Sequence, residues 1–226
     1  MYTYSHPRPA LSVDVVIFSL RDSQLQVLLI QRAGEPFQGM WALPGGFVRM
    51  DESLEEAASR EMQEETGLQE AYLEQLYTYG EPSRDPRGRV VTVAYFALIP
   101  ADAVFRKEGG SDASQALWYP INTLPDLAFD HKEIIHYAYR RLRYKLEYSA
   151  VGFELLPTEF TLSEIQQTYE MILREKLDKR NFRRRILQAG IIESTDRMRS
   201  GEGRPARLYH YREDAVAEVK ARRLFP

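Results

Sequence analysis

The sequence predicts an α/β domain over residues 1–150, followed by a winged helix-turn-helix domain over residues 151–226. Apolar, strand-like runs surround one helical segment in the first part, whereas the second part has the order helix, tight turn, basic helix and hairpin. Charge also differs between the parts. From Ile172 to Pro226 there are 15 Lys and Arg against 8 Asp and Glu, and the remaining residues have 15 against 25. This asymmetry indicates either a nucleic-acid-binding surface or a solvated basic helix face.

The first part opens with a predicted β-hairpin. Leu11–Phe18 and Leu25–Ile30 are apolar runs that a short polar turn separates. Ser53 then begins a helix, with Glu56 placed to complete a capping box and Gly67 placed to end it. Further elements are expected at Val90–Ile99 and Ala116–Ile121 (strands) and at His131–Tyr148 (a helix with Ile134, Ile135, Ala138, Leu142 and Leu146 on one face).

The second part begins after a predicted boundary at Gly152–Pro157. Thr161 and Glu164 form a second capping-box pattern, and the helix that they start is expected to run to about Lys176. The other predicted elements are a helix from Asp178 to Gln188, ended by Gly190, and a hairpin formed by Ile191–Ile192 and Leu208–Tyr211.

The helix that begins at Ser53 carries carboxylates where an amphipathic helix would carry apolar residues. Ala57 and Ala58 lie on its apolar stripe, but the next positions on that stripe are Glu61 and Glu65, with Glu64 beside them. Carboxylates at this spacing repel one another and weaken a helix. Bound divalent cations would relieve the repulsion, because Mg²⁺ prefers carboxylate oxygen. The alternative is a solvated acidic helix in a different register.

These glutamates belong to a longer spaced pattern. It consists of Gly, five residues, Glu, seven residues, Arg-Glu, an apolar residue, any residue, Glu-Glu, any residue, Gly and an apolar residue. Nine positions fill it: Gly46, Glu52, Arg60, Glu61, Met62, Glu64, Glu65, Gly67 and Leu68. The pattern resembles the box of the Nudix superfamily. That resemblance implies an α/β/α sandwich that hydrolyses a nucleoside diphosphate linked to another moiety.

The same resemblance implies a role for each polar residue of the box. Glu61, Glu64 and Glu65 would hold Mg²⁺ or Mn²⁺, and Glu52 would assist the metals or the attacking water. Arg60 would fix the helix through an ion pair, although its position four residues from both Glu56 and Glu64 also permits ordinary helix pairing. The expected catalytic residues are therefore Glu52, Arg60, Glu61, Glu64 and Glu65.

Arginines outside the box point to the ligand. The segment Ser83–Arg89 resembles a stretch of ADP-ribose-recognising Nudix domains, and its three arginines could form forked hydrogen bonds with phosphate or ribose oxygens. An exposed hairpin turn is the alternative interpretation. The expected ligand-binding residues are Arg32, Gly46, Arg84, Asp85 and Arg87.

The helix after Asp178 combines an apolar face, formed by Phe182, Ile186 and Leu187, with basic residues on the rest of its surface. Lys and Arg can neutralise phosphates, and Arg and Asn can read bases in a major groove. Arginines around the predicted hairpin turn suit a wing that enters the minor groove. A basic self-association module is the alternative. The expected DNA-binding residues are Lys179, Arg180, Asn181, Arg183, Arg184 and Arg204.

Together the two parts resemble the NrtR family, the Nudix-related transcriptional regulators of bacterial NAD metabolism. Besides the box, the likeness is carried by Ser83–Arg87, Phe160–Leu162, Tyr169–Glu170, Leu177–Arg183 and Gly203–Ala206. The resemblance implies a homodimer that binds a palindromic operator and responds to ADP-ribose or a related NAD-derived compound. It implies a repressor of NAD biosynthesis or salvage genes. A sugar-responsive regulator of the same architecture, or an ADP-ribose pyrophosphatase with an accessory domain, is the alternative.

Composition limits the other possibilities. The chain has no cysteine, which excludes disulfides, thiolate metal sites and cysteine nucleophiles. No apolar run is long enough to span a bilayer, and Met1–Arg8 lacks the pattern of a secretory signal. We therefore expect a cytoplasmic protein with no membrane partner.

Overall fold

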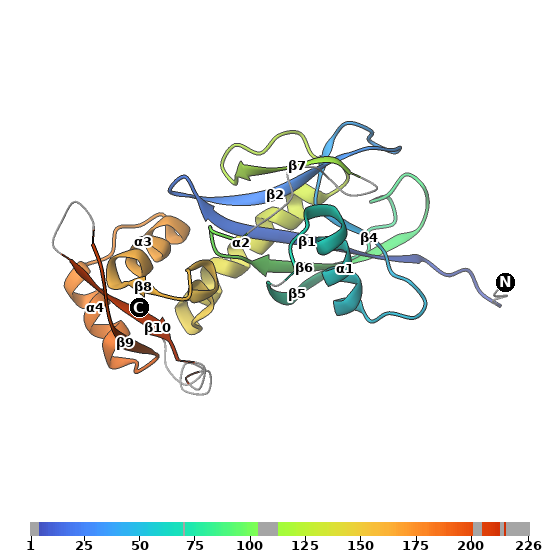
Figure 1. Ribbon diagram of the computed structural model, residues 1–226. Helices are drawn as coiled ribbons and strands as arrows, with labels where there is room; N and C mark the ends of the chain where they lie inside the picture. Colours follow the sequence, from blue (N-terminus) through green and yellow to red (C-terminus); the bar gives the residue numbers. More distant parts are fainter. Residues whose placement is uncertain (1–4, 70, 104–112, 201–204, 213–214, 216–226) are drawn as a thin grey trace. The chain divides into compact units, whose positions relative to one another are not determined.

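The computed structural model describes residues 5–69, 71–103, 113–200, 205–212 and 215. The chain forms two compact units (Figure 1). The first unit comprises Met1–Phe18, Gln26–Leu98 and Ala103–Ala138, and the second comprises Ser19–Leu25, Ile99–Asp102 and Tyr139–Pro226. The expected second domain began at residue 151, whereas the second unit also includes the second half of a helix that begins at His131.

The first unit is built on a seven-stranded sheet. Its central strands follow the order β3-β2-β1-β6-β5, while β4 pairs with β1 and β7 pairs with β2. β1 and β6 are parallel, with Ala10 opposite Val90 and Phe18 opposite Leu98. The strands are β1 (Ala10–Arg21), β2 (Gln24–Arg32), β3 (Trp41–Ala42), β4 (Gly45–Phe47), β5 (Tyr72–Tyr79), β6 (Val90–Leu98) and β7 (Ala113–Pro120).

Two helices cover this sheet. Helix α1 (Leu54–Thr66) and the first half of α2 (His131–Tyr148) lie on opposite faces of it (Figure 1), as the predicted sandwich requires. Ser53 and Glu56 form the predicted capping box, and Gly67 ends α1 in the left-handed conformation. The five apolar residues predicted on one face of α2 are all fully buried.

The short strand β4 and the edge strand β5 were not predicted. No strand was expected at Gly45–Phe47, but Gly45 pairs with Asp14 of β1. A Cβ atom on Gly45 would lie 2.3 Å from the carbonyl oxygen of Val13, so glycine permits this close pairing. β5 lacks a regular alternation of buried and exposed residues, and its pairing with β6 is irregular between Gln75 and Tyr77.

The second unit contains the predicted winged helix-turn-helix fold. Its three strands pair in the order β8-β10-β9, and two helices precede the β9–β10 hairpin. The elements are a 3-10 helix η1 (Val151–Leu155), β8 (Phe160–Thr161), α3 (Leu162–Leu173), α4 (Lys179–Gln188), β9 (Ile192–Arg199) and β10 (Ala206–Tyr211).

Helices α3 and α4 of this unit begin at the predicted N-cap residues. The capping box at Thr161 and the N-cap at Asp178 are both present. The expected end of the first helix at Lys176 was wrong, because Arg174 adopts the left-handed conformation and ends α3 at Leu173. The expected boundary around Gly152 is a packed turn, since Val151, Phe153 and Leu155 are buried.

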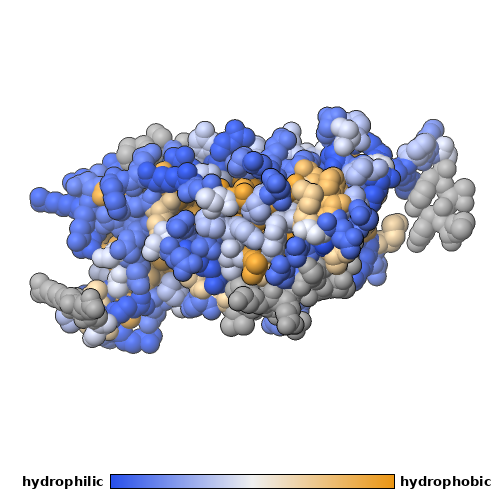
Figure 2. Space-filling model, turned by 90° about the horizontal axis from the view of Figure 1, so that it is seen from above, coloured by the Kyte–Doolittle hydropathy of each residue, from blue (hydrophilic) through white to orange (hydrophobic). Residues whose placement is uncertain are grey.

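Hydrophilic side chains cover most of the surface seen in Figure 2, with apolar patches between them. Across the described part of the chain, no helix has both the length and the apolar character needed to cross a membrane.

Candidate functional site

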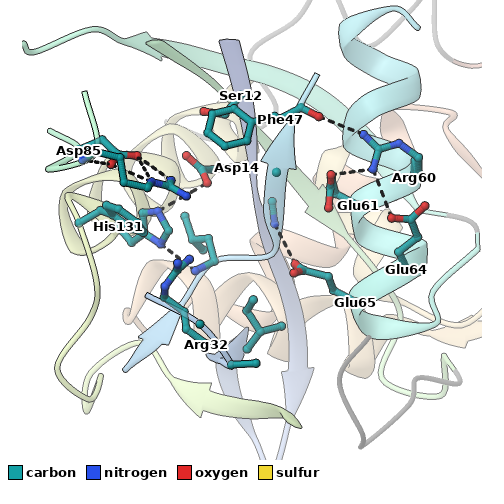
Figure 3. Close-up of a pocket in the computed structure, with 18 of the residues that line it drawn as sticks. Ser12, Asp14, Arg32, Phe47, Arg60, Glu61, Glu64, Glu65, Asp85 and His131 are labelled. Atoms are coloured by element: carbon teal, nitrogen blue, oxygen red, sulfur yellow. Dashed lines mark hydrogen bonds and ion pairs between the residues drawn. The ribbon is translucent and has the colours of Figure 1, made fainter. Parts of the chain in front are cut away.

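A cavity of about 650 Å³ opens in the first unit, within the range of small-molecule sites (Figure 3). Strand β1 contributes Ser12 and Asp14 to its wall, and α1 contributes the carboxylates of the box. Arginines and aromatic side chains complete the lining. The expected residues that line it are Arg32, Gly46, Arg60, Glu61, Glu64, Glu65, Arg84, Asp85 and Arg87.

Each carboxylate that α1 directs at the cavity has a partner within the protein. Glu65 accepts a hydrogen bond of 2.9 Å from the backbone N–H of Gly45. Glu61 forms an ion pair of 2.6 Å with Arg60, and Glu64 lies 3.3 Å from Arg60 (Figure 3). Glu64 also lies 3.3 Å from Arg49. Burial raises the pKa of Glu61 in spite of its ion pair. The mutual repulsion expected from the sequence is thus offset by arginines.

Arg60 connects α1 with the loop before it. Its guanidinium donates to both oxygens of Glu52, at 2.6 and 2.8 Å, and to the carbonyl oxygen of Phe47 at 3.3 Å. These bonds lower the pKa of Glu52 to about 2. Of the two helix pairs considered from the sequence, Arg60 makes the one with Glu64, while Glu56 completes the capping box.

Gly46 leaves room for the carboxylate of Glu61. A Cβ atom at this position would lie 2.2 Å from Oε1 of Glu61, which is far below a van der Waals contact. The glycine of the box is therefore needed for the close approach of β4 to α1, and it borders the cavity without supplying a side chain.

Arg84 is buried, and it donates to protein carboxylates. Its guanidinium makes hydrogen bonds of 2.9 and 2.7 Å with Asp130 and lies 3.4 Å from Asp14. Arg87, in contrast, is half-exposed and donates to the buried Asp85 at 2.7 Å. Hence Arg87 presents more of its side chain to solvent than Arg84 does.

Two cationic side chains of the cavity, Arg32 and Arg87, lie near the ring of Phe129. The guanidinium carbon of Arg32 lies 4.9 Å from the centre of the Phe129 ring, and that of Arg87 lies 5.7 Å from it. Arg87 also lies 5.2 Å from the ring centre of Phe47. Stacked guanidinium and aromatic groups make this end of the cavity suited to an anion attached to a flat ring.

His131 is a cavity residue that the sequence did not reveal. Its Nδ1 accepts a hydrogen bond of 2.9 Å from the N–H of Leu43, so the neutral ring carries its proton on Nε2. That nitrogen lies 3.5 Å from Asp14, and burial lowers the pKa of His131. Asp14 could have been found from the sequence, because it is an acid within a mostly apolar strand. No pattern in the sequence indicates that Asp130 or Phe129 belongs to the site.

The donor set of α1 fits a hard divalent cation in its chemistry. No three His, Cys, Asp or Glu side chains of the described residues are grouped so that they could hold a metal ion. Mg²⁺ is commonly bound through only one or two carboxylates and keeps several waters. Glu61, Glu64 and Glu65 all line the cavity, and their binding of Mg²⁺ or Mn²⁺ stays a prediction.

The basic helix α4 of the second unit differs from α1 in whether its charged side chains have partners of opposite charge. Among the described residues, no carboxylate forms an ion pair with a side chain of α4. Arg183 donates to the hydroxyl of Ser163, and Arg184 donates to the side chain of Asn181. Lys179, Arg180 and Arg184 are exposed, so α4 presents uncompensated positive charge to solvent.

The arginines of β9 are held by acidic residues. Arg197 forms an ion pair of 2.5 Å with Glu159. Arg199 pairs with Glu164 and donates to the carbonyl oxygen of Glu159 at 3.0 Å. Arg204, which was expected to contact DNA, lies outside the described residues.

Comparisons with known proteins identify both parts of the chain. Residues 152–211 match the NrtR DNA-binding winged helix domain, and residues 10–138 match the NUDIX domain. The chain is 43% identical over 208 residues to the ADPR responsive transcriptional repressor NtrR of Acinetobacter baylyi, covering 91% of this chain and 83% of the relative. The chain belongs to the NrtR family.

Two solved structures of Shewanella oneidensis NrtR extend this assignment. The full protein complexed with a 27mer DNA is 40% identical, has a TM-score of 0.81 and covers 92% of this chain and 95% of that chain. The NUDIX domain complexed with ADP ribose is 43% identical, with a TM-score of 0.56, and covers 61% of this chain and 91% of that chain. The fold expected from the NrtR resemblance is thereby confirmed.

Proposed function

We propose that this chain is a transcriptional repressor of NAD biosynthesis or salvage genes that binds double-stranded DNA through α4 and senses ADP-ribose in the cavity of its first unit. The observation that carries the proposal is the uncompensated positive charge of α4 in the described residues. A polyanion relieves such charge, and the release of counterions from DNA drives the association. The Acinetobacter relative is named an ADPR responsive transcriptional repressor, and the Shewanella protein was solved with a 27mer DNA and, as its NUDIX domain, with ADP ribose.

ADP-ribose suits the cavity chemically. Arg49 and Arg87 offer exposed guanidinium groups for a diphosphate, and Phe129 and Phe47 offer aromatic faces for a base. Asp14 can accept a hydrogen bond from a ribose hydroxyl. We place Arg84 among the ligand-binding residues through its position in the wall, although its guanidinium also holds Asp130.

Assembly and location are part of the same proposal. A homodimer in the cytoplasm would bring two copies of α4 to a palindromic operator, with half-sites about one helical turn apart, near 34–36 Å.

Operator binding with and without ADP-ribose tests the proposal. We expect duplex binding that weakens as salt rises, and a loss of DNA affinity of about 5- to 150-fold when ADP-ribose saturates the protein, a typical range for coupled sites. The titration is done without added metal to limit turnover. DNA affinity that does not respond to ADP-ribose, with or without Mg²⁺, would exclude the sensor function; replacing ADP-ribose by arabinose tests the sugar-responsive alternative.

Hydrolysis of ADP-ribose is a second candidate function, because all four carboxylates of the box are present. Water would add across a P–O bond of the diphosphate and give AMP and ribose 5-phosphate. Bound Mg²⁺ or Mn²⁺ neutralises the diphosphate and makes hydroxide available near neutral pH. Glu65→Gln should abolish product formation while its amide oxygen still accepts the N–H of Gly45. If wild-type protein forms no AMP over hours with excess metal, the enzyme proposal fails.

A further inference from the structure

A single helix belongs to both units of the molecule. Helix α2 runs without interruption from His131 to Tyr148, and the division between the units falls between Ala138 and Tyr139. Its first half therefore belongs to the unit that contains the cavity, and its second half to the unit that contains α4. At 1.5 Å per residue, these 18 residues extend over about 27 Å.

The start of α2 is attached to the wall of the cavity. Asp130, immediately before the helix, accepts two hydrogen bonds from Arg84, at 2.9 and 2.7 Å. His131, its first residue, accepts the N–H of Leu43 and lies 3.5 Å from Asp14. Arg84 lines the cavity. His131 and Asp14 line it as well (Figure 3). A ligand that accepts a hydrogen bond from Arg84, or donates one to Asp14, competes with the contacts that hold this end of the helix.

The second half of α2 holds the end of α3. Tyr139 donates its hydroxyl proton to the carbonyl oxygen of Ile172 at 2.9 Å, and Arg143 donates to that of Leu173 at 3.2 Å. Carbonyls in the last turn of a helix have no intrahelical donor, so side chains are needed to satisfy them. The guanidinium of Arg174, the C-cap of α3, lies 5.3 Å from the ring centre of Tyr139.

The end of α3 determines where α4 begins. Only the short turn from Arg174 to the N-cap Asp178 separates the two helices. Glu170 of α3 accepts a hydrogen bond of 3.0 Å from the N–H of Leu177 and forms an ion pair with Lys176, and both contacts restrict the conformation of the turn. A displacement of the second half of α2 therefore acts on α4 through contacts within one unit.

We propose that α2 is the element through which ligand binding alters DNA binding, with Tyr139 and Arg143 as the positioning residues at its DNA-binding end. This inference rests on the proposed function and names how the site is regulated. Coupling requires that ADP-ribose binds one arrangement of α2 more tightly than another, and DNA must then weaken ADP-ribose binding by the same factor. Neither positioning residue lines the cavity, so substituting them removes no direct contact with the ligand.

The test uses the full-length variant Tyr139→Phe/Arg143→Met and a matched control, Tyr144→Phe, in which an exposed hydroxyl is removed from the same helix. The DNA probe is the duplex that wild-type protein enriches from a random library of about 30 base pairs, long enough for two half-sites. Fluorescence anisotropy gives DNA affinity with and without saturating ADP-ribose, and calorimetry gives ADP-ribose affinity without DNA, all in EDTA.

We expect the double variant to keep its ADP-ribose affinity within about threefold, while the effect of ADP-ribose on DNA affinity falls from the wild-type 5- to 150-fold range to roughly twofold or less. Tyr144→Phe should behave as wild type. If the double variant couples as strongly as wild type, the inference is wrong even though the proposed function stands. A wild-type protein without coupling overturns both. If the double variant does not fold, the same measurements are made on Asp130→Asn. This change removes the ion pair between Asp130 and Arg84 at the cavity end of α2, so it should also reduce the effect of ADP-ribose on DNA affinity.

Discussion

Helices α1 and α4 each carry several side chains of like charge, but only on α1 do some of them have partners of opposite charge among the described residues. Three carboxylates of α1 line a cavity, where Arg60 and Arg49 form ion pairs with two of them and a backbone N–H donates to the third. The basic side chains of α4 face solvent, and no described carboxylate pairs with them. A site that takes a small ligand can keep its charges balanced and ordered before the ligand arrives. A surface that takes a polyanion gains affinity by leaving its charge uncompensated.

The close packing around α1 gives the largest expected effect. Gly46→Ala should destabilise the first unit by roughly 1–3 kcal/mol, because its Cβ would overlap the carboxylate of Glu61. Gly34→Ala is the matched control, since it also borders the cavity and its Cβ would meet nothing within 4 Å. Urea unfolding of both variants checks the difference. Equal stability of the two would mean that Glu61 is not held as described.

The charge of α4 is tested by Arg180→Ala together with Arg184→Ala, which leaves the Arg183–Ser163 hydrogen bond intact. DNA affinity should fall at least about tenfold, or ~1.4 kcal/mol, and should depend less steeply on salt. Lys132→Ala with Arg89→Ala removes the same charge from exposed positions of the first unit, and it should have a much smaller effect. Anisotropy titrations at several salt concentrations measure both. A similar loss in the two double variants would show that net charge, not α4, determines binding.

Arg60→Gln removes the cation that balances α1. The melting temperature near neutral pH should fall by at least about 2–4 °C. Because hydrogen bonds from Arg60 lower the pKa of Glu52 to about 2, that stabilisation is complete above about pH 4.5 and is lost as pH falls towards 2. The difference between variant and wild type should therefore narrow in acid. Arg89→Gln, which loses a bond to the carbonyl oxygen of Gly80, is the control. A difference that widens in acid would contradict this account of Glu52.

The smallest effect is expected at β9, where arginines are already paired. Glu159→Gln should release Arg197, which is 74% exposed, and strengthen binding to a mixed-sequence duplex by about two- to fivefold, as expected for an exposed ion pair. Glu193→Gln removes an acid of β9 that pairs only with His210 among the described ion pairs, and it is the control. Weaker binding by Glu159→Gln would indicate that the pair orients Arg197 towards DNA.

The sequence by itself determined the local elements and the residues of the box. Caps at Ser53, Thr161 and Asp178 act over three residues, and the buried face of α2 repeats every three to four, so neighbouring residues are enough to specify them. These helices begin where the sequence indicated, and Glu61, Glu64 and Glu65 of the box line one cavity because one helix carries them.

Only the tertiary structure decided which partners the charged groups take. The contact of Arg84 with Asp130 spans 46 residues, that with Asp14 spans 70, and that of His131 with Leu43 spans 88. No local pattern encodes such pairs, because they depend on which strands the sheet places together. The same holds for the glutamates that restrain Arg197 and Arg199, and for the irregular edge strand β5. Propensity and spacing act along the chain, whereas burial and charge pairing act across it, and the latter assemble the cavity wall.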